Sequence, residues 1–505
     1  MLAPVTPGIF TMYTCGPTVY DYAHVGNFRA FLTYDVLKRV LLYCNYTVSH
    51  VCNLTDVDDK IIQRANEQAL QDVTELTRKF EGCFMADLAA LNIVKADRYP
   101  RATQHIPEMM DMILELATKG LAYETADGSW YFATQQQPGY GTQLVQLSYD
   151  DMQQTERGES AGKQHFADFC LWKAFKEGVD RTDMAWESDK IQLGRPGWHL
   201  ECSAMARKFF GSETIDLHGG GVDLKFPHHE NEIAQSEGCL PPGQSFCNCW
   251  FHNGFVNVDN EKMSKSLGNF LTLRTACPTA DDVRAYRYLV VSSQYRNPLA
   301  FTPQAMSAAK NAVKRIDKIK AELEKAIAQS DNVAGVGQAS SELAVSAVPK
   351  AMNNFKAAIL DDLAMPRAAA CLFALVNAAE GEFKRVAKQG DSDISLAVGT
   401  DAASAAGLDI AGLTAILEAM QEMDQIFGIF YQVPLGEGDS AEAANSSVPL
   451  EIPATVMDLV AQRTAAKDAK NWELADSFRV QITELGFSVK DVKGGDPVVS
   501  RKEEQ

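Results

Sequence analysis

The segment Trp198–Glu232 reads WHLECSAMARKFFGSETIDLHGGGVDLKFPHHENE and brings a cysteine, histidines and carboxylates into one short stretch. Zinc binds Cys, His and Asp or Glu side chains in tetrahedral sites, so Cys202, His228 and Glu232 form a candidate ligand set. His228 and Glu232 are four residues apart and would share one face of a helix. His229 has an apolar residue at the same offset, which makes His228 the better candidate of the two.

A fourth zinc ligand would come from elsewhere in the chain, and Cys15, in the sequence YTCGPTVY, is a candidate. A second interpretation stays open, in which both cysteines are core thiols and the two histidines are polar surface groups. The set lacks the Cys-x-x-Cys spacing of strong zinc motifs, so the spacing alone does not decide between them.

Length and composition limit the class of protein. The 505 residues predict three or four domains, because single cores stop growing at about 250–300 residues. The apolar runs are too short to span a bilayer, and the N-terminus lacks the pattern of a secretory signal. The 11 scattered cysteines indicate reduced thiols, so we expect a cytoplasmic location, with an organellar location after processing as the alternative.

The net charge of −19 argues against a non-specific nucleic-acid coat, whose affinity would depend on basic side chains. It leaves open a large enzyme that binds one structured RNA through local patches.

The first 43 residues resemble the first unit of a doubly wound parallel sheet. A strand is predicted over residues 8–19, with a break at Gly16, and a helix over residues 30–43. A nucleotide phosphate would lie at the start of that helix, where free N–H groups favour anions. His24 and Asn27 would donate to the phosphate and Gly26 would let a base approach; alternatively, His24 and Asn27 only cap the helix.

The next elements continue the same pattern. A strand is predicted over residues 46–53, followed by a helix for which Asp56 is the candidate N-cap. Thr55 would lie at the carboxyl end of that strand, where ligands bind in such sheets. Residues 99–193 change in character, with a hairpin expected around Asp127, and we interpret them as an insertion.

A loop at residues 261–269 follows a strand predicted over residues 251–258. In this loop Lys262, Ser264 and Lys265 would clamp a polyphosphate, since ammonium groups act as point charges for phosphate. The alternative is an ordinary solvated basic turn.

Beyond residue 302 the sequence predicts helices. Residues 303–432 are rich in Ala, Leu and Lys and indicate an antiparallel helical bundle. A flexible linker is expected over residues 436–447. The remaining residues, 448–505, would form a small unit built on a helix over residues 456–485.

Longer motifs resemble those of the cysteinyl-tRNA synthetase family of class I aminoacyl-tRNA synthetases. The residues His24 to Asn27 stand where that class carries its HIGH signature, and residues 262–266 match its KMSKS signature unchanged. The resemblance extends from Tyr13 to about Lys493. It also rests on four stretches of sequence: CGPTVYDYAHVGNFR, NLTDVDDKI, PGWHLECSAM and DLHGGGVDLKFPHHENEIAQS.

The resemblance implies an α/β fold: a doubly wound parallel-sheet (Rossmann-like) class I synthetase catalytic domain with an insertion, then an α-helical bundle and a small C-terminal domain. The implied domains, in chain order, are the first catalytic half at 1–98, the connective-peptide insertion at 99–193, the second catalytic half with the zinc ligands at 194–256, the KMSKS loop and stem-contact region at 257–302, the tRNA-contacting bundle at 303–435, the linker at 436–447 and the anticodon-binding domain at 448–505.

The implied activity is that of a cysteine ligase, which joins L-cysteine to tRNA(Cys) with ATP through cysteinyl-adenylate. Mg²⁺ is expected with ATP. The implied catalytic residues are His24, Asn27, Lys262 and Lys265. The implied ATP-binding residues are these four together with Gly26, Gly219, Gly220, Asp223 and Ser264.

The resemblance also implies one zinc ion per chain, held by Cys15, Cys202, His228 and Glu232. A cysteine pocket would be formed by Thr55, Trp198, Cys15 and His228. Serine differs from cysteine by one atom, so shape alone separates the two poorly, whereas zinc favours a soft thiolate. A monomer that binds no membrane is expected, with Trp472 a candidate for stacking on anticodon bases.

The chain departs from the family pattern at two places, and two alternative functions remain. Asn27 replaces the usual last His of the HIGH signature but keeps a donor. The tail, residues 491–499, lacks the tryptophan that the family often has. One alternative is a paralogue that passes cysteine to a small amine, against which residues 448–505 argue. The other is a catalytically inactive tRNA-binding paralogue, against which the complete signatures argue.

Overall fold

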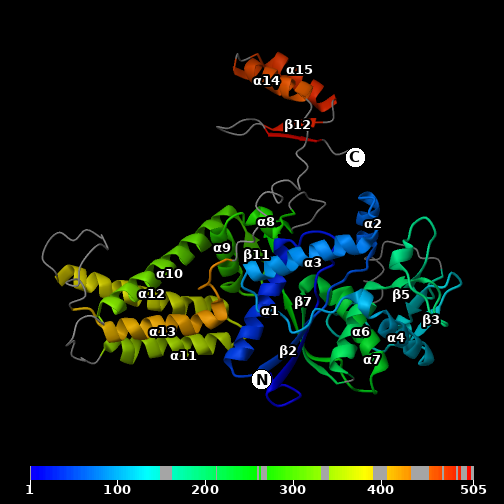
Figure 1. Cartoon of the computed structure of the whole chain (residues 1–505), viewed down its shortest axis with the longest axis horizontal. Helices are drawn as coiled ribbons and strands as arrows, with labels where there is room; N and C mark the ends of the chain where they lie inside the picture. Colours follow the sequence, from blue (N-terminus) through cyan, green and yellow to red (C-terminus); the bar gives the residue numbers. More distant parts are fainter. Residues whose placement is uncertain are drawn as a thin grey trace. The chain divides into compact units, whose positions relative to one another are not determined.

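The structure is a computed structural model of the whole chain (Figure 1). It describes residues 2–147, 162–211, 213–258, 261–262, 270–330, 341–389, 407–433, 454–468, 471–484, 487–490 and 498–501. The chain divides into two units, residues 1–435 and 436–505. Within the described part of the chain, no helix has the length and apolar character needed to cross a bilayer.

A parallel sheet forms the centre of the first unit, as the sequence predicts. Its strands run in the order β2-β1-β7-β8 and all pair in parallel. Most of their residues are buried, because helices cover the sheet (Figure 1). The strands are β1 (Ile9–Thr14), β2 (Thr47–Cys52), β7 (Ile215–Gly221) and β8 (Cys247–Asn253).

The helix α1 (Val25–Tyr43) begins five residues earlier than the sequence predicts. His24 is its N-cap and accepts a hydrogen bond from the Asn27 N–H, while the Asn27 side chain accepts from the His24 N–H. This reciprocal capping box satisfies two donors at the start of the helix and explains the earlier start.

The N-cap predicted at Asp56 is wrong. Helix α2 (Asp59–Glu67) is capped by Asp58, whose side chain accepts from the Lys60 N–H. Asp56 is buried and accepts two hydrogen bonds from Thr103. Helix α3 (Val73–Ala90) follows.

The inserted region forms a second, antiparallel sheet of order β3-β4-β5-β6. Its first two strands form a hairpin around Asp127, and Gly128 adopts a positive φ in the turn. The last strand, β6, begins at residue 194, so the sheet extends beyond the residues we assigned to the insertion. The elements are η1 (Ala102–Gln104), α4 (Ile106–Thr118), β3 (Ala122–Glu124), β4 (Trp130–Phe132), η2 (Thr134–Gln136), β5 (Phe169–Ala174), η3 (Thr182–Met184) and β6 (Gly194–Pro196).

The strand predicted over residues 251–258 is two strands in different sheets. The parallel strand β8 ends at Asn253, and β9 (Val256–Val258) belongs to a small sheet with β10 (Glu261–Lys262) and β11 (Leu299–Phe301). A Cβ on Gly254 would lie 2.6 Å from the Asn297 carbonyl, so only glycine fits at this position. The other elements of this region are α6 (Trp198–Phe210), η4 (Val222–Leu224), η5 (Lys225–His229), α7 (Glu230–Cys239), α8 (Leu273–Ala276) and α9 (Ala280–Val291).

Four helices, α10 to α13, lie side by side after the region of the parallel sheet (Figure 1). Their apolar faces pack together through fully buried residues such as Ile316, Phe355 and Met420. This packing is typical of a helical bundle. The elements are α10 (Pro303–Ser330), η7 (Leu343–Ala347), α11 (Val348–Ile359), α12 (Met365–Gln389) and α13 (Ile410–Phe427).

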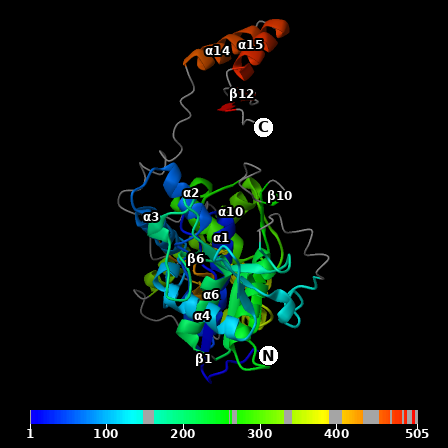
Figure 2. The same cartoon turned by 90° about the vertical axis from the view of Figure 1, so that its right-hand side faces the viewer.

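The second unit contains two helices where the sequence predicted one over residues 456–485. Helix α14 (Ala454–Asp468) and helix α15 (Trp472–Glu484) lie side by side (Figure 2). Val456, Val460 and Ile482 form a small core between them, which one continuous helix could not close. The strands β12 (Phe487–Lys490) and β13 (Val498–Arg501) pair antiparallel, and the predicted linker lies outside the described residues.

Candidate metal centre and ligand cleft

Four side chains that are far apart in the sequence meet at the carboxyl end of β1. Cys15 follows β1, Cys202 lies in α6, His228 in η5 and Glu232 in α7. Their donor atoms all lie within 4.8 Å of one another. All four side chains are buried, His228 with 1% of its surface exposed and Glu232 with none. The structure therefore brings together the complete predicted ligand set.

The Glu232 carboxylate is central to this cluster. Its Oε1 lies 3.0 Å from His228 Nε2 and 3.7 Å from Cys15 Sγ. The His228 Nδ1 lies 2.9 Å from Nδ1 of His199, so the ring is held from behind with Nε2 directed at the carboxylate. The i, i+4 spacing of His228 and Glu232 thus produces the contact that the sequence predicts, although His228 lies in the turn before α7.

The electrostatics of the cluster favour the anionic forms of Cys202 and Glu232, and the neutral thiol of Cys15. The hydrogen bond from Cys15 lowers the pKa of Cys202 to about 6, while burial raises the pKa of Cys15. Burial alone would raise the pKa of Glu232, but the imidazoles of His218 and His228 hold it well below its usual range. Burial alone would lower the pKa of His228, but Glu232 and Cys202 raise it to about 10. Buried negative charges of this kind need a cationic partner.

Two further histidines, His218 and His229, lie beside this cluster, and the sequence analysis did not identify them as ligands. His218 Nε2 lies 2.9 Å from Glu232 Oε2, and His229 Nε2 lies 3.4 Å from Cys15 Sγ. Cys15, His218, His229 and Glu232 form a second set of donors that lie within 4.8 Å of one another. We rejected His229 because of its neighbour at offset four, whereas Glu232 lies at offset three and shares the same helix face. The spacing gives no signal for His218, which comes from β7.

A cavity of about 380 Å³ opens above the four-ligand cluster. Gly221 and Phe270 line it and were not predicted. The predicted site residues that line it are Cys15, His24, Gly26, Asn27, Thr55, Trp198, Cys202, Asp223 and His228. Most of the predicted ATP and cysteine sites therefore share one cleft.

Gly219 and Gly220 are not among the residues that line the cleft. A Cβ on Gly220 would lie 2.5 Å from the His229 ring, and one on Gly219 would lie 2.4 Å from the Phe251 ring. Both glycines are therefore needed for close packing, and their contact with adenosine stays a prediction.

The structure describes only part of the segment that resembles the KMSKS signature. Ser264 and Lys265 lie outside the described residues, and Lys262 is described only as part of β10. Phe270 is the next described residue, and its ring lies 5.0 Å from the His24 ring. The Val25 N–H donates to the Leu271 carbonyl. Phe270 and Leu271 thus lie beside the start of α1.

Thr55 and Trp198 both line the cleft beside the cluster. The Thr55 hydroxyl donates to Glu201 Oε2 at 2.8 Å, and burial raises the pKa of that carboxyl well above its usual range. Trp198 is 41% exposed and its ring centroid lies 4.3 Å from that of His228. Trp198 therefore lines the cleft and is not part of the hydrophobic core.

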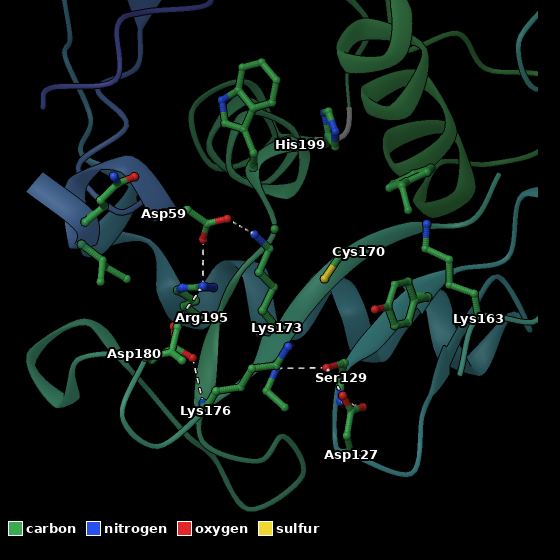
Figure 3. Close-up of a pocket in the computed structure, with 18 of the residues that line it drawn as sticks. Asp59, Asp127, Ser129, Lys163, Cys170, Lys173, Lys176, Asp180, Arg195 and His199 are labelled. Carbon is green, nitrogen blue, oxygen red and sulfur yellow. Dashed lines mark hydrogen bonds and ion pairs between the residues drawn. The ribbon is translucent and has the colours of Figure 1, made fainter. Parts of the chain in front are cut away.

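A larger cavity, of about 1270 Å³, lies between α2 and the inserted sheet. Lys173 and Arg195 are cross-strand neighbours on β5 and β6, and both reach Asp59, at 2.6 and 2.8 Å (Figure 3). Arg195 also pairs with Asp180 at 3.0 Å. Trp198 lines both cavities, so it stands where the large cavity meets the cleft.

Comparison with known proteins gives consistent relatives. Residues 1–311 match the family described as the tRNA synthetases class I (C) catalytic domain. The chain is 39% identical over 489 residues to a cysteine--tRNA ligase of Chlamydia caviae, covering 96% of this chain and 93% of the relative. It is 37% identical over 493 residues to a cysteine--tRNA ligase of Janthinobacterium, covering 97% and 95%.

A solved structure with the same fold is the Mycobacterium tuberculosis methionyl-tRNA synthetase in complex with methionyl-adenylate. The TM-score is 0.59, with 14% sequence identity over 86% of this chain and 93% of that chain. At this identity the likeness supports the fold alone.

Proposed function

The chain belongs to the cysteine--tRNA ligase family of class I aminoacyl-tRNA synthetases, and we propose that it selects cysteine through one zinc ion held by Cys15, Cys202, His228 and Glu232. The observation that carries this proposal is the buried four-donor cluster beside the cleft, which three of the four ligands also line. The overall reaction joins L-cysteine to tRNA(Cys) and converts ATP to AMP and pyrophosphate.

The residues present fit zinc. A tetrahedral zinc ion with Zn–N near 2.0 Å and Zn–S near 2.3 Å separates its donors by about 3.3–3.7 Å. The separations of Glu232 Oε1 from His228 Nε2 and from Cys15 Sγ are 3.0 and 3.7 Å, close to that range. Zinc bound there would favour a soft thiolate over a hydroxyl and would lower the pKa of the substrate thiol.

The substrate carboxylate would attack the α-phosphate of ATP in the same cleft. This step forms cysteinyl-adenylate and releases pyrophosphate; a terminal hydroxyl of the tRNA then displaces AMP. The protein contributes chiefly position and charge stabilisation. His24 and Asn27, at the start of α1, would contact the phosphates, because free N–H groups and the helix dipole favour anions there.

Lys262 and Lys265 would hold the departing pyrophosphate. The position of Phe270 beside His24 supports this proposal, because the five residues from Lys265 to Phe270 span at most about 18 Å. Asp223 lines the cleft and would accept a hydrogen bond from the ribose, and Mg²⁺ would accompany ATP.

The large cavity would admit the 3′ end of the tRNA. Its lining combines aromatic residues, on which unstacked bases can lie, with lysines that can contact phosphates. Tyr131, Lys163 and Lys176 are among these residues. Trp198 leads from this cavity into the cleft, which supports a path for the acceptor end to the adenylate.

Three measurements on the full chain test the proposal. We expect one zinc per chain by elemental analysis, ATP–pyrophosphate exchange that depends on cysteine, and charging of purified tRNA(Cys). Exchange at background level would contradict the activity. Intact exchange without charging would instead support a ligase that passes cysteine to a small amine.

A further inference from the structure

Two sets of buried metal donors meet at Cys15 and Glu232. One set is completed by Cys202 and His228, the other by His218 and His229. We propose that Cys15, His218, His229 and Glu232 form a second position for a divalent transition-metal ion, which keeps the ion in the protein when Cys202 or His228 is lost as a ligand. The inference rests on the proposed zinc centre, because the two positions share two ligands.

The separations in the second set are those of a metal site. Cys15 Sγ lies 3.4 Å from His229 Nε2 and 3.7 Å from Glu232 Oε1. His218 Nε2 lies 2.9 Å from Glu232 Oε2. Tetrahedral zinc requires donor separations of about 3.3–3.7 Å, so small movements of these atoms would close a complete coordination shell.

The Glu232 carboxylate faces both positions: Oε1 lies near Cys15, His228 and His229, and Oε2 lies near His218. Glu232 Oε1 lies 3.0 Å from His228 Nε2, whereas Oε2 lies 2.9 Å from His218 Nε2. An ion could therefore pass from one position to the other while it remains bound to Cys15 and Glu232. The first set has two thiols and one imidazole, and the second has one thiol and two imidazoles.

The two additional histidines are held in place from behind. His229 Nδ1 lies 2.8 Å from His252 Nε2, which leaves Nε2 directed at Cys15. A second partner of this kind is typical of histidines that bind metals. The His218 ring stacks on Trp250 at 4.4 Å between centroids.

The rings of His218 and His229 lie in the interior of the protein. His218 and His229 are completely buried, and a side chain on Gly220 would collide with the His229 ring. The buried Nδ1 of His218 has no hydrogen-bond partner in the described part of the chain. Buried imidazoles without a full set of partners are costly unless a ligand or ion compensates for the loss of water.

Cobalt(II) titration of the full-length protein tests the second position, because thiolate-to-cobalt charge-transfer bands report how many thiolates bind the ion. We expect the wild type to bind one cobalt through two thiolates. The variant Cys202→Ser/His228→Asn should still bind one cobalt, with about half the charge-transfer intensity per ion, since one of two thiolates remains. Adding His218→Asn and His229→Asn should abolish binding.

The matched control is His218→Asn/His229→Asn alone, which should keep one cobalt and the full intensity. A folded Cys202→Ser/His228→Asn variant that binds no cobalt would overturn the second position and leave the proposed zinc centre intact. A wild type that binds no cobalt or zinc would contradict the proposed centre itself.

If the double variant does not fold, the single variant His228→Asn decides the question. It should retain one ion, and His228→Asn/His229→Asn should lose it. Loss of the ion from folded His228→Asn would overturn the proposal.

Discussion

Glu232 Oε1 lies 3.0 Å from His228 Nε2, one turn apart along the chain, and both side chains are buried. The same carboxylate contacts Cys15 and His218. Glu232 therefore links every proposed metal donor except Cys202, and changes to it should affect the centre more than changes to any other carboxylate.

Glu232→Gln should weaken zinc binding at least about 100-fold, because the substitution keeps the shape but removes the charged ligand. Zinc affinity measured by competition with a chelator checks this expectation. The control is Glu75→Gln, on the exposed face of α3, which should bind zinc like the wild type. Equal affinities in the two variants would remove Glu232 from the ligand set.

Lys265→Ala should slow cysteine-dependent pyrophosphate exchange about 100-fold or more, since removing one donor to developing charge commonly costs that much. The KM for cysteine should change little, because the ammonium group acts on the leaving pyrophosphate. Steady-state exchange kinetics separate kcat from KM. Lys325→Ala, exposed on α10, is the control, and an exchange rate for Lys265→Ala that matches it would refute the role.

Lys176→Glu should reduce charging of tRNA(Cys) and leave pyrophosphate exchange unchanged, because this exposed lysine lines the large cavity and not the cleft. The kcat/KM for tRNA in the charging assay and the rate of cysteine-dependent pyrophosphate exchange measure the two effects. Lys190→Glu is a matched exposed control outside the cavity lining. If both variants charge tRNA equally well, the proposed path of the acceptor end is wrong.

Arg287→Met should lower the free energy of unfolding by about 3–5 kcal/mol, because it removes one of the two guanidinium groups paired with the buried Asp35 carboxylate and leaves buried carbonyls without their donor. The Arg287 Nη2 lies 2.6 Å from Asp35 Oδ2, and both side chains are completely buried. The same guanidinium donates to the Phe427 and Leu91 carbonyls, so it joins the bundle to the catalytic region.

Urea denaturation measures this loss against Arg296→Met. Arg296 pairs with Asp362 at 2.6 Å, but 58% and 48% of the two side chains are exposed. Exposed pairs contribute about 1 kcal/mol or less. Similar losses in the two variants would contradict the argument from burial.

The sequence predicted the elements of the sheet domain, because strand alternation and helix periodicity are local properties, and motifs and the family resemblance supplied nine of the residues that line the cleft. The sequence-based prediction failed where contacts between residues far apart in the chain determine the local structure. The end of β8 at Asn253 depends on the approach of Asn297 to Gly254, and Asp56 is buried by Thr103 instead of capping α2. The break between α14 and α15 depends on a core that only two helices can form.

The ligand cluster shows the same limit. The spacing of His228 and Glu232 identified two ligands on one helical turn, Cys202 and Cys15 were candidates by residue type, and the family resemblance implied all four as one set. Spacing could not identify His218, which reaches Glu232 from another element. Only the sheet order, which places β7 beside β1, brings His218 and Cys15 to the same carboxylate.

The preference for cysteine over serine, measured as the ratio of kcat/KM in pyrophosphate exchange before and after removal of the metal, tests the central claim most directly. The account predicts that a protein depleted of zinc loses this preference and recovers it when zinc is restored. A metal-free protein that still discriminates cysteine from serine as well as the zinc-loaded protein would contradict the account.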